Sequence, residues 1–332
     1  METSREIDPN GDVILCLHNP GAPFARRISE PEEIQFRVSS RHLMLASPYF
    51  KKALDGPWEE SAPDTADHHL YISAEDWDPQ AFLILMHIIH GRNGQVPRSV
   101  SLELLAKIAV LVDYYECYEA VEVFAEIWLR QLKDQVPKKI NRELILWLCV
   151  SWIFSATDIF TAVTKTALEQ ARGPLPTLYL PIPPAIVETI ESRRQETVDK
   201  IYTVLSELYV FFRDGPDPCH FECSAIRLGA LIKEIRPKRL DPRPKLPLLG
   251  YCIHKTKKAA CSILSPPTRD PHNISTASGG RKTYGSYTVC GLQSAVGGKM
   301  QVLDLAGMPG MELSHFNGRR SPRGLKLQVD IG

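Results

Sequence analysis

The chain has 332 residues, 44% of them hydrophobic and 23% charged, which is an ordinary composition for a globular protein with room for two domains and a tail. Its formal net charge is +0, but residues 1–130 contain 11 Lys and Arg against 21 Asp and Glu, whereas residues 131–332 contain 28 against 18. This split excludes one uniformly basic nucleic-acid surface. The basic excess after Lys233 is interpreted as a solvated tail in preference to a contact with an acidic partner.

The sequence has neither the signal of a secreted protein nor that of a membrane protein. Residues 1–6 are acidic and are not followed by the apolar core of a signal peptide. The longest uncharged apolar run, residues 144–154, is shorter than the ~20 residues that a membrane span needs, and it predicts a buried helix. Eight cysteines without a leader favour reduced thiols. We therefore expect a cytoplasmic or nuclear protein that is not held in a membrane.

Residues 35–54 carry the most informative local pattern. Residues 35–38 alternate polar and apolar, which predicts a half-buried strand. Ser39 and Ser40 can then cap a helix. Because Pro48 cannot donate a backbone hydrogen bond, that helix must end near Ser47, and a second helix begins at the proline. The apolar positions of the two helices are Leu43, Met44, Ala46, Tyr49, Phe50 and Leu54.

This segment resembles the BTB/POZ family, in which a hydrophobic residue, a short polar turn, a Leu and then Ala-Ser-Pro-Tyr-Phe lie between the second strand and the helical core. Residues 11–17, with an Asp before an apolar run, are similar to the opening strand of that family. Residues 69–72 resemble its third strand, residues 78–90 the next helix, and residues 102–132 the last helical pair.

The resemblance covers residues 10 to about 130 and implies an α+β fold, with a small three-stranded sheet packed on a helical cluster. It also implies a core motif consisting of Asp12, Phe36, Val38, Ser39, Leu43, Ala46, Ser47, Pro48, Tyr49 and Phe50. Strand-exchanged dimers of the family use an extra helix and strand upstream of the opening strand. Residues 1–10 are too short for both, so we do not expect that kind of exchange.

Residues 131–264 are predicted to form a helical region. A long helical pattern runs from Asn141 to Ala171, a stiff connector follows at residues 181–184, and a second long helix covers Ile190 to Phe212. Glu191, Arg193, Arg194 and Glu196 are assigned to the polar face of that second helix. Two shorter helices are expected near residues 224–235 and 251–264.

Residues 265–332 are rich in Gly, Ser, Arg and Pro and are predicted to be a disordered tail. Two weak strand-like pieces, Tyr287–Cys290 and Met300–Leu305, do not outweigh that composition. The whole arrangement resembles a fungal BTB group with a helical second half. Residues 180–183 and the segment from Cys219 to Leu231 carry this second resemblance.

No residue set indicates catalysis, so we expect no enzyme activity, no cofactor and no metal. Cys219, His220 and Cys223, with Cys252, His254 and Cys261 downstream, were weighed as a zinc site, but a second pair at matching spacing is absent and core packing is preferred. His87 and His90 share a helix face but have no third ligand and are interpreted as a partly buried pair. Residues 255–258 could form a nuclear-import patch, although a solvated face is preferred.

BTB domains are protein-interaction units. The resemblance therefore implies an adaptor that self-associates or docks to a cullin scaffold of a ubiquitin ligase, through helical surfaces near Ser47–Leu54 and Val96–Tyr115. The alternative is a scaffold or transcription-associated protein whose basic tail after Lys233 contacts an acidic surface. Protein partners are expected in both cases, and nucleic-acid binding is not.

Overall fold

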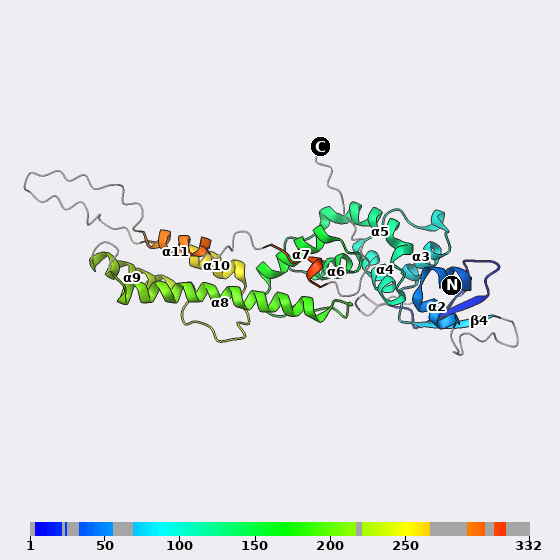
Figure 1. Cartoon of the computed structure of the whole chain (residues 1–332), viewed down its shortest axis with the longest axis horizontal. Coiled ribbons are helices and arrows are strands. Elements are labelled where there is room, and N and C mark those ends of the chain that lie inside the picture. The colour runs from blue at the N-terminus through cyan, green and yellow to red at the C-terminus, as the bar shows by residue number, and fades with distance from the viewer. Residues whose placement is uncertain are drawn as a thin grey trace, which may run out of the picture. The chain divides into compact units, whose positions relative to one another are not determined.

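A computed structural model describes most of the chain and divides it into two compact units (Figure 1). The described residues are 4–21, 24, 33–55, 69–216, 221–265, 291–302 and 309–316. The first unit consists of Met1–Thr166, Pro176–Ile186 and Gly310–Gly332. The second unit consists of Ala167–Leu175 and Val187–Pro309. The described part of the fold is α+β, as expected, with one small sheet and a majority of helices.

The sheet of the first unit has four strands in the order β1-β3-β2-β4. They are β1 (Ser4–Glu6), β2 (Val13–His18), β3 (Glu33–Val38) and β4 (Leu70–Glu75). β2 and β3 are antiparallel, with Val13 opposite Val38 and Leu15 opposite Phe36, whereas β1 pairs with β3 and β4 pairs with β2 in parallel. The expectation of three strands was wrong, because residues 4–6 add a short strand along β3.

Helices follow the order that the chain pattern predicts. In the first unit they are α1 (Ser40–Ala46), α2 (Pro48–Asp55), α3 (Pro79–Ile89), α4 (Leu102–Tyr115), α5 (Tyr118–Leu132) and α6 (Arg142–Ile153). Pro48 separates α1 from α2, as its missing N–H requires. Phe36, Phe50, Phe82 and Trp128 are fully buried and form the centre of this unit.

The helical pattern expected from Asn141 to Ala171 is two helices. The helix is interrupted at residues 154–156, between α6 and α7 (Thr157–Gln170), where Ser155 adopts the left-handed conformation with φ of 52°. Nearly every residue of α6 is buried, and α6 packs against α4. The compact units therefore do not follow the expected division after residue 130, because α6 adds a layer to the first unit.

The second unit is built on the long helix α8 (Pro184–Asp214). The other helices are α9 (Phe221–Ile235), α10 (Ile253–Cys261) and α11 (Leu292–Val302). Their shared core includes Leu205 and Leu208 from α8, Leu231 from α9 and Ala260 from α10. α9 and α10 lie close to the positions predicted for the two shorter helices.

Part of the predicted disordered tail is ordered. In α11, Leu292, Val296 and Met300 recur every four residues and are buried in the core of the second unit, so this stretch of the predicted disordered tail is a helix. Tyr287–Cys290 and residues 303–305 lie outside the described residues.

A second ordered piece of this tail, residues 309–316, belongs to the first unit. Its Met311 N–H donates to Thr164 Oγ1 at 2.8 Å, and Met311 and Leu313 are buried. Gly310 lies so close to the backbone of Thr161 that a β-carbon would overlap the Thr161 carbonyl. A glycine is therefore needed at this position.

Candidate functional site

The residues of the expected core motif lie together at the start of α1 and α2. Asp12 Oδ1 accepts a hydrogen bond from the Ser40 N–H at 2.8 Å, and Asp12 Oδ2 accepts one from the Ser40 hydroxyl at 2.6 Å. Burial alone would raise the pKa of Asp12, but these hydrogen bonds from Ser40 hold it below its ordinary value. Asp12 thus attaches the first turn of α1 to the sheet. Phe36, Val38 and Leu43 are fully buried beside it, whereas Ala46 is partly buried.

Ser47 connects α2 to the end of α4. Its hydroxyl donates to the Tyr115 carbonyl at 2.5 Å and accepts from the Phe50 N–H at 3.1 Å. The side chain is completely buried, so its two hydrogen bonds satisfy groups that water does not reach. This short polar contact fixes which side of α2 faces the core, and therefore where Tyr49 points.

His90 fixes the beginning of α1 from another helix. Its Nε2 accepts from the Ser39 N–H at 2.9 Å, so the ring proton lies on Nδ1, which donates to the Met86 carbonyl at 2.9 Å. Burial lowers the pKa of His90, which favours this neutral form. The His42 ring lies 5.1 Å away. Sequence reasoning placed His90 at the border of the core but gave no signal for its contact with Ser39.

An aromatic cluster is centred on Tyr115, which is buried at the C-terminal end of α4. Its ring stacks on Phe50, with centroids 4.6 Å apart and planes 10° from parallel. The indole N–H of Trp77 donates to the Tyr115 hydroxyl at 3.1 Å. Desolvation raises the pKa of Tyr115, so the hydroxyl is protonated at neutral pH.

Three further aromatic rings extend this cluster to the surface, and we call Tyr49, Trp77 and Tyr114 the aromatic surface. Tyr49 is 38% exposed, Tyr114 is 49% exposed and Trp77 is half-buried. The Tyr114 ring lies 5.2 Å from Tyr49 and 5.1 Å from Trp77, and all three rings contact Tyr115. The exposed rings are therefore held in place by a buried one.

Sequence reasoning identified Tyr49 as part of a motif but did not connect it with Trp77 or Tyr114. The only local signal was the pair of tyrosines at the end of a predicted helix, within the expected surface at Val96–Tyr115. The neighbourhood of Tyr114 is acidic, because Glu116 and Glu119 are exposed at the corner between α4 and α5. On the α2 side, Lys51 and Lys52 are exposed, so the rim of the aromatic surface carries both charges.

The structure describes only some of the residues that were considered as zinc ligands. Cys219 and His220 lie outside the described residues, whereas Cys223 and Cys252 are buried in the second unit. Across the described ranges, no group of three or more His, Cys, Asp and Glu side chains is arranged to hold a metal ion. In the same part of the chain, no helix is both long and apolar enough to cross a membrane.

Arg194 is the largest departure from the predicted polar face of the second long helix. The side chain is completely buried and pairs with both carboxylate oxygens of Glu191, at 2.8 and 2.6 Å. Its Nη1 also donates to the carbonyls of Leu248 at 3.0 Å and Tyr251 at 2.6 Å. Arg194 thus attaches the loop between α9 and α10 to α8.

No protein-family model matches the chain, and no curated protein matches it significantly.

Proposed function

We propose that the first unit is a protein-binding module of the BTB/POZ type and that the protein acts as a non-enzymatic adaptor. The order of elements supports this proposal: an antiparallel strand pair, two short helices separated by Pro48, a parallel strand and then three helices. The resemblance stated from the sequence implies the same order. The links from Asp12 to Ser40 and from Ser47 to Tyr115 give the motif residues a structural role in that arrangement.

The aromatic surface is the observation that carries the proposal. Tyrosine and tryptophan dominate the energetics of protein interfaces, because they bury a large area at a small cost in side-chain entropy. Here Tyr49, Trp77 and Tyr114 are partly exposed, while contacts with Tyr115 hold their rings in position. A surface that is already ordered loses little entropy on binding.

The proposed partner is a cullin scaffold of a ubiquitin ligase. Self-association through the same surface is the alternative that the experiment distinguishes. The alternative is a scaffold that acts through a basic tail after Lys233, and part of that tail, residues 266–290, 303–308 and 317–332, lies outside the described residues. No contact of the described residues favours that alternative over the adaptor.

The test uses the full chain, a purified cullin N-terminal region and isothermal titration calorimetry. The variant Tyr49→Ala with Tyr114→Ala removes two anchors of the aromatic surface. Since truncating an interface anchor costs about 2 kcal/mol, we expect the affinity to fall by roughly 30-fold or more. Tyr179→Ala is the matched control, because Tyr179 is 88% exposed and is not part of this surface.

Light scattering of the same samples measures self-association, and affinity capture with mass spectrometry identifies other partners. The proposal fails if the unaltered chain neither binds the cullin, nor self-associates, nor captures a protein that the double variant loses. Circular dichroism melting of each variant separates loss of binding from loss of fold.

A further inference from the structure

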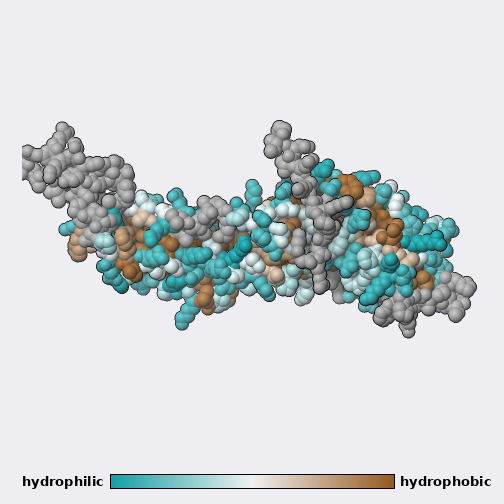
Figure 2. Space-filling view, in the orientation of Figure 1, coloured by the Kyte–Doolittle hydropathy of each residue, from teal (hydrophilic) through white to brown (hydrophobic). Residues whose placement is uncertain are grey.

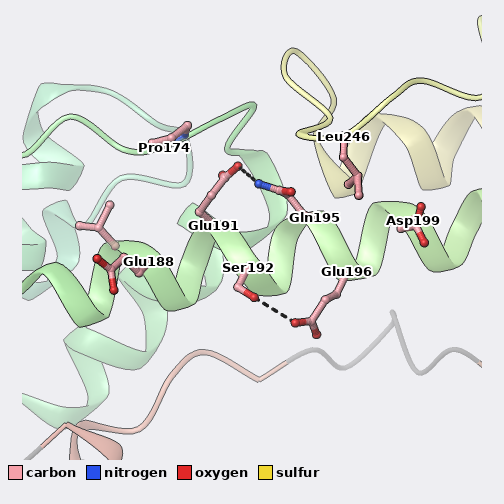
Figure 3. A pocket seen from close by; sticks show the side chains of 9 residues that line it. Pro174, Glu188, Glu191, Ser192, Gln195, Glu196, Asp199 and Leu246 are labelled. Carbon is pink, nitrogen blue, oxygen red and sulfur yellow. Dashed lines mark hydrogen bonds between the residues drawn. The ribbon is translucent and has the colours of Figure 1, made fainter.

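A groove of about 540 Å³ runs along one face of α8 in the second unit (Figure 3). α8 contributes side chains spaced three and four residues apart, from Glu188 to Asp199, which therefore lie on one face of the helix. Two segments distant in sequence contribute Pro174 and Leu246, and Figure 3 shows both above the α8 side chains. The groove thus has walls from three parts of the second unit.

One wall of the groove is apolar and exposed. Leu246 is 69% exposed and Leu249, on the same loop, is 60% exposed. Figure 2 shows hydrophobic side chains on this loop beside α8. The loop is held against α8, because buried Arg194 donates to the carbonyls of Leu248 and Tyr251. Leu246 is thus an exposed apolar side chain of the groove wall, on a loop that Arg194 holds in place.

The charged side chains that line the groove are all acidic, and two of them are not neutralised. Glu191 is paired with Arg194, and Asp199 accepts from Arg243 at 2.6 Å. Glu196 accepts only the Ser192 hydroxyl, at 3.0 Å (Figure 3), and Glu188 makes no ion pair within the ranges that the structure describes. The groove therefore combines an apolar wall with two carboxylates, Glu188 and Glu196, that form no ion pair with any residue that the structure describes.

We propose that this groove binds a basic segment of a second protein. The aliphatic stem of a Lys or Arg lies along Leu246 and Val187, and its charged end reaches Glu188 and Glu196. Lys and Arg suit this groove because their aliphatic stems can pack on the apolar wall while their charged ends pair with the carboxylates. The proposal goes beyond the proposed function, since it concerns the second unit and holds whether or not the first unit binds a cullin.

The test measures fluorescence anisotropy of a labelled peptide of alternating arginine and proline, titrated with the full chain at low salt. An alternating glutamate and proline peptide is the probe control. We expect the Glu188→Gln, Glu196→Gln double variant to bind the basic peptide about tenfold more weakly, because it loses two exposed ion pairs. Leu246→Ser should weaken binding about threefold through loss of the apolar wall.

Glu207→Gln is the matched control variant, because Glu207 is also on α8 but pairs with Lys299 outside the groove. It should bind like the unaltered chain. Equal loss in Glu207→Gln and the double variant would mean adsorption to net negative charge and would overturn the proposal. An unchanged affinity in Leu246→Ser, or no binding by the unaltered chain, would overturn it as well. All of these positions are at the surface, and circular dichroism melting checks that each variant folds.

Discussion

Replacing Arg194 by methionine should destabilise the second unit and leave the first unit unchanged. The guanidinium is completely buried and makes two hydrogen bonds to Glu191 and three to the carbonyls of Pro247, Leu248 and Tyr251. Methionine keeps much of the aliphatic volume but supplies no donor. The variant therefore leaves a carboxylate and several carbonyls without partners in a largely dry environment.

The size of the effect follows from how much water reaches those groups. Removing one partner from a buried ion pair costs about 3–5 kcal/mol, because the other charge stays buried alone. The Glu191 side chain is 15% exposed, so part of its charge is hydrated and the lower limit applies. We expect a loss of about 3 kcal/mol in the free energy of unfolding. With a urea dependence of about 2 kcal/mol per M, the midpoint falls by about 1.5 M.

The assay exploits the distribution of tryptophan. All five tryptophans lie between Trp58 and Trp152, within the first unit, so their fluorescence reports on that unit, whereas circular dichroism reports helices in both. In the variant, we expect urea unfolding followed by circular dichroism to show an additional transition at lower urea concentration, while the midpoint followed by tryptophan fluorescence stays constant. Arg193→Met is the control, with an effect within about 0.5 kcal/mol. A dichroism midpoint that matches the unaltered chain would refute the assignment of Arg194 as a buried clamp.

Three further outcomes are expected. Ser47→Ala should cost the first unit about 1–3 kcal/mol by tryptophan-monitored urea unfolding, because the Tyr115 carbonyl loses its buried donor; a neutral effect would contradict the contact. His90 prefers its neutral form when folded, so its stabilisation is present above its ordinary pKa of 6.5 and is lost as the pH falls below that value; His90→Gln should flatten this part of the pH profile of stability, and an unaltered profile would contradict this role of His90. Gly310→Ala should release residues 309–316 from Thr161 and speed proteolysis of that segment, and an unchanged cleavage rate would contradict the close backbone contact.

The elements of the first unit could be predicted from the sequence because their signals are local. Alternation over residues 35–38 gave β3, and the proline at position 48 gave the break between α1 and α2. β1 could not be predicted in this way, because three residues are too few to establish a period and its pairing partner lies about thirty residues away.

The departures in the second unit have a common physical cause. Arg194 was assigned to a polar face because arginine usually contacts water, and the carbonyls that bury it come more than fifty residues later. α11 was assigned to a disordered tail because Gly, Ser, Arg and Pro dominate residues 265–332, whereas Leu292 and Met300 are buried by contacts in the core of the second unit. In both cases tertiary contacts outweigh local preference.

The same dependence on distant contacts explains why neither candidate surface was visible in the sequence. The aromatic surface needs Ser47 to orient α2 toward Tyr115, and the groove needs Arg194 to hold the loop that carries Leu246. In each unit a buried polar side chain makes hydrogen bonds that hold the segment carrying an exposed side chain. A fixed apolar side chain binds with less entropy loss than a free one.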